Sequence, residues 1–291
     1  MVYSDETRIR RLGDLVKQIR DAGIVDAKTK KKLWLSWGKK NKKELEKVFE
    51  YKRTNKKGTK EIYDLFDVFF HPKYPLLIGF THANKITHWT EPLKLCRGLI
   101  FDTNGQLLAR PYKKFFKLNE TPETVVDELS EEETFTVVDS YSDHLTTAFL
   151  YDDGSGSEIV FATKDSFTSS RPAYELLYKM LFKYPSNKID WHLTLSARTF
   201  LFEVVHPEYE ENIDYHKEEA LILVGITAHD PFDEWGVGDV QNRSIRLGVD
   251  SLRTYNDYSL DQLINQKASS NKDFIVKFED GLRVEIMGKG E

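Results

Sequence analysis

The sequence has few of the patterns that mark secreted or membrane proteins. Its 291 residues include one cysteine, Cys96, which excludes an intramolecular disulfide framework and any cysteine-rich zinc site. No apolar run approaches the roughly 20 residues that a membrane-spanning helix needs. The N-terminus also lacks the basic-then-apolar pattern of a signal peptide. We therefore expect a cytoplasmic protein.

Positive charge is concentrated in one segment of a chain whose net charge is -5. Residues 28–60 hold 13 Lys and one Arg against three Glu, a balance of +11, so the remaining residues sum to -16. A basic segment on an acidic body favours contact with nucleic acid phosphates, and Lys39, Lys40, Lys42 and Lys43 are the expected RNA contacts. A solvated lysine-rich helix explains the same pattern equally well.

Helical periodicity fills the first part of the chain. Ser4 is the expected N-cap of a helix that ends at Gly23, and a short helix is predicted over residues 62–69. Strands are then predicted at residues 76–80, 99–101, 107–109, 135–138, 146–150, 159–162, 200–205, 221–226, 274–278 and 282–286, with helices at 171–184 and 260–266. Strands grouped in hairpins predict an α+β fold of antiparallel sheets with flanking helices. We expect a helical, lysine-rich extension over residues 1–70 and a β-rich body over residues 71–291.

Two stretches of the body stand out. Residues 134–151 read TFTVVDSYSDHLTTAFLY, which places a polar turn at residues 139–144 between two strand segments. Residues 96–101 read CRGLIF and residues 109–120 read ARPYKKFFKLNE. In residues 96–101 and 109–120, the basic side chains of Arg97, Arg110, Lys113 and Lys114 lie close to an aromatic pair and suit a phosphate-binding site. A hairpin with one basic face is the plain structural alternative.

These motifs resemble those of the ATP-dependent RNA ligases of the phage RNA-repair type, which are covalent nucleotidyltransferases. The similarity continues with LFEVVHPE at residues 201–208, LILVGI at residues 221–226 and FIVKFEDGLRVEI at residues 274–286. It covers roughly residues 75–291 in the family's order and spacing. The resemblance implies a nucleotidyltransferase (ATP-grasp-like ligase) fold. It also implies a lysine that attacks ATP to form lysyl-AMP, with a divalent metal such as Mg²⁺ at the phosphates.

The chain departs from the family at the positions that do this chemistry. The register of the flanking strands puts Ser140 where the family has its nucleophilic lysine. Ser142 and Asp143 then stand at the family's Asp-Gly pair. Lys272 stands where the family has a metal-binding glutamate, and Glu285 and Met287 replace two phosphate-facing lysines. A serine hydroxyl is a poor nucleophile without a base to activate it. The changes together indicate that adenylyl transfer has been lost.

Other residues of the resemblance are retained. The expected nucleotide-binding positions are Arg97, Gly98, Arg110, Lys114, Phe116, Ser140, Lys164, Glu203 and Lys277. In the family, the position of Glu203 contacts the ribose. A strand-edge carboxylate paired with a lysine is the structural alternative for Glu203, an exposed strand lysine is the alternative for Lys164, and a hairpin residue is the alternative for Lys277. His206, His216 and His229 lack metal-ligand spacing, so no metal site is expected.

Three functions fit these observations. The first is a catalytically degenerate RNA-ligase-like domain that binds ATP, another nucleotide or an RNA end without covalent chemistry. The second is an active RNA ligase whose nucleophile has moved to His144 or Lys164, and only this case requires Mg²⁺. The third is a protein-interaction or decoy module, for example in a phage or a bacterial defence system.

Overall fold

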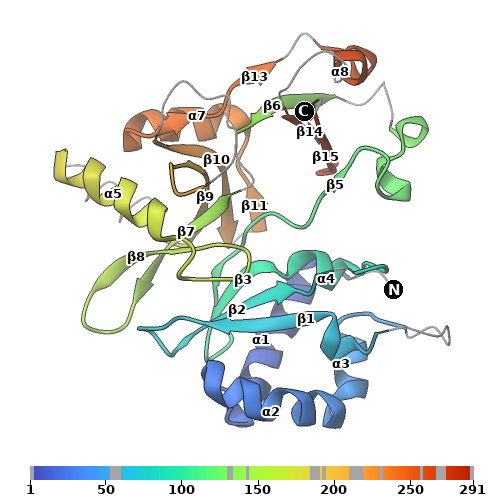
Figure 1. Cartoon of the computed structure of the whole chain (residues 1–291), viewed down its shortest axis with the longest axis vertical. Coiled ribbons are helices and arrows are strands. Elements are labelled where there is room, and N and C mark those ends of the chain that lie inside the picture. Colours follow the sequence, from blue (N-terminus) through green and yellow to red (C-terminus); the bar gives the residue numbers. More distant parts are fainter. Residues whose placement is uncertain are drawn as a thin grey trace.

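The computed structural model describes residues 3–52, 60–84, 86–129, 134–141, 144–183, 191, 195–209, 219–229, 232–255, 258–266 and 273–288. Three mainly antiparallel sheets dominate the described part of the chain. Figure 1 shows the N-terminal helices at one end of the molecule and the sheet that holds the C-terminal strands at the other. The predicted α+β class with antiparallel sheets is confirmed.

The first helices form one end of the molecule and pack on the first sheet. They are α1 (Asp5–Asp21), α2 (Ala27–Lys40) and α3 (Lys42–Val48). Ser4 caps α1 as predicted, because its hydroxyl accepts a hydrogen bond from the amide of Thr7 at 3.3 Å. The buried positions of α1 include Ile9, Leu12 and Val16, which join one core with the strands of the first sheet.

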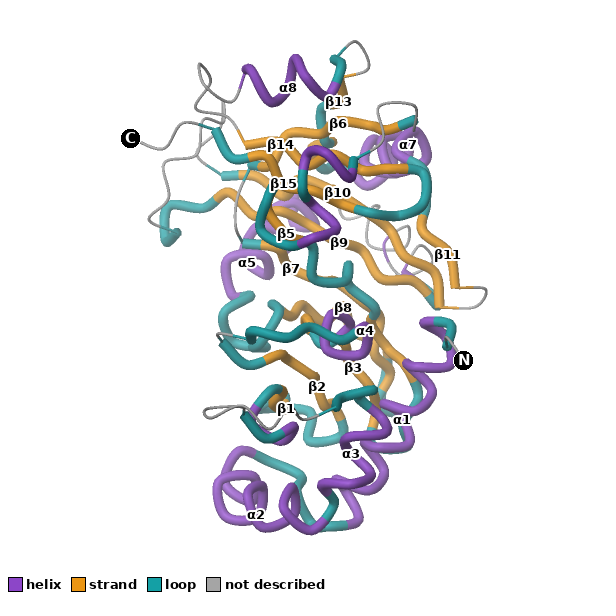
Figure 2. The backbone as a smooth tube through the Cα atoms, turned by 90° about the vertical axis from the view of Figure 1, so that its right-hand side faces the viewer, coloured by secondary structure: helices purple, strands orange, loops and turns teal. Residues whose placement is uncertain are grey.

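The first sheet has the strand order β1-β2-β3-β4. Its strands are β1 (Phe66–Phe70), β2 (Leu77–His82), β3 (Arg97–Asp102) and β4 (Leu107–Ala109), with the short helix α4 (Glu91–Leu95) before β3. Figure 2 shows α1 running alongside this sheet, with α2 and α3 at the end of the molecule away from β6 and β13.

The helix predicted over residues 62–69 is wrong. The chain forms a 3-10 turn at Ile62–Asp64 and then enters β1. Phe66 and Val68 point into the core while Asp67 between them pairs with Lys30 at 2.9 Å. That alternation has the period of a strand, and pairing with β2 outweighs the helical spacing of the same apolar residues. The division of the chain near residue 70 stays a proposal, and β1 and β2 pair across it.

The second sheet has the order β11-β10-β9-β7-β8, with β12 beside β10. Its strands are β7 (Leu145–Asp152), β8 (Ser157–Ala162), β9 (Arg198–Val205), β10 (Ala220–His229), β11 (Phe232–Glu234) and β12 (Asp250–Ser251). The helices α5 (Arg171–Lys183) and α7 (Val237–Leu247) pack on it through a second core that includes Phe200, Phe202 and Leu223.

The third sheet has the order β13-β6-β14-β15-β5. Its strands are β5 (Phe116–Lys117), β6 (Phe135–Ser140), β13 (Thr254–Tyr255), β14 (Asp273–Phe278) and β15 (Arg283–Ile286). The 3-10 turns at Pro122–Thr124 and Val126–Glu128 and the helix α8 (Leu260–Gln266) complete this part of the molecule. Because β6 ends at Ser140 and β7 begins at Leu145, the turn predicted at residues 139–144 connects the third sheet to the second.

All ten predicted strands and both later helices are present, with ends shifted by a few residues. The sequence reading missed α7 and the short pieces β5, β11, β12, β13 and α4. Within the described ranges, no helix is long and apolar enough to cross a membrane.

Candidate functional site

A cavity of about 270 Å³ opens where the second and third sheets meet. Its walls come from the ends of β6 and β7, from β3, β9, β14 and β15, from α7 and from the loop before β5. Six of the predicted site residues line it: Arg97, Lys114, Ser140, Lys164, Glu203 and Lys277. Gly98 lies next to Arg97 in β3. The fold therefore brings together residues that lie as much as 180 positions apart in the sequence.

Ser140 is the last residue of β6 and lies opposite Asp273 of β14. The next residue, Tyr141, is buried and fixes the start of the turn. Its backbone amide donates to the Oε2 atom of Glu203 at 2.6 Å, and its phenol oxygen accepts from the amide of Arg253 at 3.1 Å. Ser142, Asp143 and Lys272 lie outside the described residues. The described part of the turn is held from two sides, so Ser140 keeps its place on the cavity wall.

Glu203 is buried in β9, opposite Leu145 of β7. A buried carboxylate is costly unless hydrogen bonds satisfy it. The amide of Tyr141 supplies such a bond, and the charge assistance makes it one of the stronger kinds. Glu203 thus connects the turn to the second sheet at the same time as it lines the cavity.

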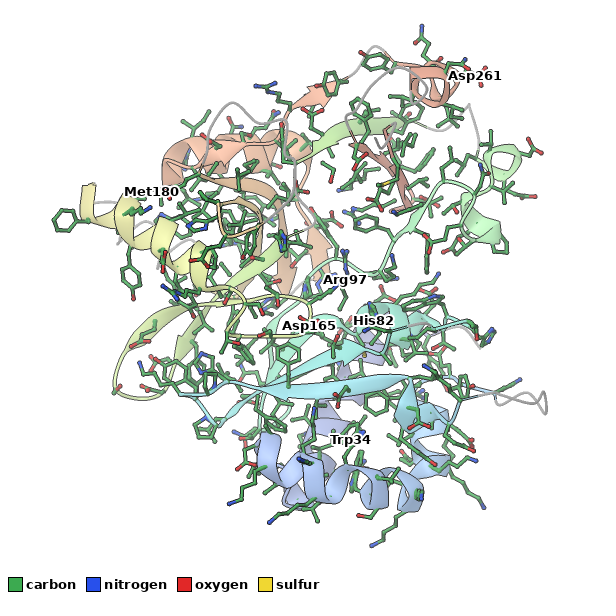
Figure 3. The ribbon with its side chains drawn as sticks, in the orientation of Figure 1. Trp34, His82, Arg97, Asp165, Met180 and Asp261 are labelled. Atoms are coloured by element: carbon green, nitrogen blue, oxygen red, sulfur yellow. The ribbon has the colours of Figure 1, made fainter. Side chains whose placement is uncertain are left out.

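Positive side chains gather on one wall of the cavity. Figure 3 shows Arg97 and His82 together in the middle of the molecule. Burial lowers the pKa of His82, and the charges of Arg97, Lys114 and Lys164 lower it further. Burial also lowers the pKa of Lys114, again with a contribution from Arg97. Cations held this close together favour a bound anion.

Gly98 allows this wall to form. Its φ of 88° is a left-handed conformation that favours glycine, and a Cβ atom there would lie 3.0 Å from the carbonyl oxygen of Thr163. The same Cβ would lie 3.1 Å from the Cα of Lys164. The missing side chain therefore lets β3 approach the loop that carries Lys164.

Another part of the cavity lining holds two cations that share one carboxylate. Lys277 Nζ lies 3.0 Å from the carboxylate of Glu234, and Arg283 pairs with the same carboxylate. The guanidinium of Arg283 stacks over the ring of Tyr112 at 3.9 Å. Burial lowers the pKa of Lys277, as expected for an amine that leaves water. Glu285 lines the same wall, two residues along β15 from Arg283.

Arg110 and Phe116 lie outside the wall of this cavity. The guanidinium of Arg110 donates to the carbonyl oxygens of Ala228 at 3.0 Å and Asp233 at 2.5 Å, which joins the segment after β4 to β10 and β11. Phe116 is buried and meets the ring of Trp89 edge-on at 5.4 Å. Both residues position the segment that carries Lys114.

His144 lines a second, adjoining cavity of about 570 Å³. Its ring stacks on that of Tyr209 with centroids 3.6 Å apart. Arg97, Leu145 and Lys164 line both cavities, so these side chains form their common wall. Lys164 is exposed and forms no ion pair with a described residue.

Several cavity residues were missed by sequence reasoning. Asp139 is buried, and its Oδ1 atom has no hydrogen-bond partner among the described residues. Burial, and then a hydrogen bond to Asp139, raises the pKa of Tyr255 to about 12. Trp235, Val237 and Val240, just before and at the start of α7, form an apolar part of the lining. Asp139 could have been found from its place beside Ser140, but nothing in the sequence places α7 here.

The described residues do not offer a metal site. In the ranges given above, no three His, Cys, Asp or Glu side chains are grouped as metal ligands. The acidic cavity residues are spread over β6, β9 and β15, and Glu203 is engaged by the amide of Tyr141.

A family model described as RNA ligase matches residues 95–281, more than half of the chain. The chain belongs to this RNA ligase family. The match begins just before Arg97 and includes every described residue of the first cavity except Arg283 and Glu285. The predicted family resemblance is thus confirmed. Comparison with curated proteins found no match.

This chain is similar in structure to solved RNA ligases, with low sequence identity. A variant of Naegleria gruberi RNA ligase with ATP and manganese has 13% identity and a TM-score of 0.41, over 60% of this chain and 55% of that chain. An archaeal ATP-dependent RNA ligase has 10% identity and a TM-score of 0.49, over 77% of this chain and 58% of that chain. The chain thus spans little more than half the length of these ligases.

Proposed function

We propose that this RNA-ligase-like domain binds a nucleotide or an RNA end and does not form lysyl-AMP. The observation that supports the proposal is the identity of Ser140, the cavity residue at the end of β6 where the family resemblance requires lysine. A hydroxyl cannot give the phosphoramide that the next ligation step consumes. Among the described lysines of the cavity, Lys277 is held in an ion pair with Glu234.

The two ends of the cavity suit the two ends of a nucleotide. The apolar end, formed by residues such as Trp235 and Val240, would cover a base. The Oδ1 atom of Asp139 would accept a hydrogen bond from an amino group on that base. The cationic wall with Arg97 and Lys114 would hold the phosphates.

The test is incubation of the protein with ATP or GTP labelled at the α-phosphate, with Mg²⁺ or Mn²⁺. After denaturation the wild-type protein is expected to carry no label, while calorimetry shows reversible nucleotide binding. Ser140→Lys is the matched variant, because it returns an amine to the position without changing the other walls. A covalent adduct on the wild-type chain would refute the proposal.

A second function is favoured by the place of Lys164. This side chain lines both cavities and has no ion pair with a described residue, so its amine is accessible to a phosphate from either side. An active ligase with a displaced nucleophile would use Lys164 or His144. Mass spectrometric mapping of an AMP adduct to either residue would establish this function.

RNA contact through the lysine-rich helices is proposed for three of the four expected residues. Lys39, Lys40 and Lys43 are exposed, whereas Lys42 lies 2.7 Å from Glu61 in an ion pair. Figure 3 places Trp34 of α2 and Arg97 on opposite sides of the first sheet. An RNA held by α2 therefore contacts a surface separate from the cavity.

A further inference from the structure

The second cavity is built against the first one. It shares Arg97, Leu145 and Lys164 with the first cavity, and the remainder of its wall includes His144, Thr163 and Tyr209. With about 570 Å³ it has room for a base and a sugar. The function proposed above uses only the first cavity.

The rings of His144 and Tyr209 stack on each other, and the outer face of this pair gives the cavity a flat aromatic surface. The ring planes are inclined by only 12°. The phenol of Tyr209 donates to the carbonyl oxygen of Ser169 at 3.1 Å, and its amide donates to the carbonyl oxygen of His206 at 3.0 Å. The carbonyl oxygen of His144 accepts from the amide of Val204 at 3.3 Å. Aromatic rings fixed in this way bind bases by stacking without base selectivity.

The common wall is cationic. Arg97 and Lys164 lie on adjoining segments because Gly98 lets β3 approach the loop of residues 163–165. Asp165 lies on the same loop, and its carboxylate accepts a hydrogen bond from the hydroxyl of Thr163 at 3.2 Å. A phosphate at the boundary would therefore meet two cations, with the nearby carboxylate engaged by Thr163.

We propose that the two cavities form one site for two linked nucleotides. The first base occupies the apolar end beside Asp139, the bridging phosphodiester lies on Arg97 and Lys164, and the second base stacks on the outer face of the His144 and Tyr209 ring pair. This inference rests on the proposed function, since it assumes a nucleotide in the first cavity. The ligand chemistry is that of a dinucleotide unit, whether it is free or is the 5′ end of an RNA.

The experiment compares calorimetric affinities for AMP, for the linear dinucleotide pApA, for cyclic di-AMP and for a 5′-phosphorylated oligoadenylate. The wild-type protein is expected to bind pApA at least about tenfold more tightly than AMP, because a second base is stacked. Tyr209→Leu should reduce pApA affinity to that of AMP and leave AMP affinity within about twofold. Tyr209→Phe keeps the ring and should retain most of the higher affinity for pApA over AMP. Tyr178→Leu, at an exposed tyrosine of α5 outside both cavities, is the control and should match wild type.

The outcomes separate the two proposals. The dinucleotide site is overturned if AMP binds but pApA binds no more tightly, or if Tyr209→Leu keeps the higher affinity for pApA. In either case the nucleotide-binding function stands. If none of the four ligands binds, both proposals fail. If pApA binds more tightly than AMP, a higher affinity for cyclic di-AMP indicates a free signal molecule as the ligand. A higher affinity for the oligoadenylate indicates an RNA end.

Discussion

The carboxylate of Glu203 and the backbone amide of Tyr141 are joined by a hydrogen bond of 2.6 Å, across 62 residues of sequence. This bond connects the turn after β6 to the middle of the second sheet. It fixes the place of Ser140, which directly precedes Tyr141, and it explains why a carboxylate is tolerated in the buried strand β9.

Replacing Glu203 should therefore affect both stability and binding. Glu203→Ala leaves the amide of Tyr141 buried without this acceptor, so the free energy of unfolding is expected to fall by about 1–3 kcal/mol. Glu203→Gln keeps an acceptor oxygen and should cost less. Urea unfolding measures the stability and calorimetry measures AMP binding. Glu128→Ala, at an exposed residue, is the control. If both alanine variants lost the same free energy of unfolding, the role assigned to Glu203 would be contradicted.

Gly98 offers a test with a closely matched control. Gly98 and Gly154 have almost the same backbone angle, with φ of 88° and 89°. A Cβ at Gly154 would meet nothing within 4 Å, whereas one at Gly98 would press on Thr163 and Lys164. Both alanine variants should lose about 1–2 kcal/mol of stability from the left-handed backbone.

Only Gly98→Ala is expected to weaken nucleotide binding, because only this change displaces Lys164 from the common wall. Affinity for AMP measured by calorimetry, at a temperature where both variants are folded, distinguishes them. An equal affinity in the two variants would show that the position of Lys164 does not matter for the ligand.

The exposed lysines of α2 and α3 give a prediction about RNA. Changing Lys39, Lys40 and Lys43 to Glu should weaken RNA binding strongly, and changing them to Arg should preserve it. The slope of log affinity against log salt concentration should become flatter by about two units, if three phosphate contacts of a single strand are lost. Fluorescence anisotropy over a salt series measures both quantities. Unchanged affinity in the Glu variant would identify this surface as merely solvated.

His71 predicts a loss of stability in acid. Burial, reinforced by the charge of Lys73, lowers the pKa of His71 to about 4. Its Nδ1 atom accepts hydrogen bonds from the amides of Lys73 at 3.1 Å and Tyr74 at 2.9 Å, which a protonated ring cannot accept. An unfolded histidine titrates near 6.5, so the unfolded state takes up the proton first. The stabilisation is complete above about pH 6.5 and is lost as the pH falls toward 4.

Thermal unfolding between pH 4 and pH 7 measures this effect. His71→Asn retains an acceptor without a titratable ring and should reduce the pH dependence, while His88→Asn at an exposed site should not. His229, whose pKa burial also lowers to about 4, supplies part of the remaining dependence. An unaltered pH profile in His71→Asn would show that His71 is not responsible.

The fold was largely predictable because the local residue composition of most strands is typical of strands. Short runs rich in β-branched and aromatic residues located the ten strands that were predicted, and Ser4 marked the start of α1. The failure at residues 62–69 has a physical cause. Phe66, Val68 and the residues around them are apolar at spacings that fit a helix or a strand, and only pairing with β2 decides between them.

By itself, the sequence determined the family, through its ordered motifs, and the absence of lysine at position 140. Both are properties of residue identity in a register that the flanking strands define. Only the tertiary structure decided which residues share a wall. It placed Asp139, Trp235 and Tyr209 at the cavities, because strand pairing and the packing of α7 join segments that no local pattern relates. It also showed that Arg110 donates to a backbone carbonyl and that Lys42 pairs with Glu61. These internal oxygen atoms compete with any ligand for the two positive charges.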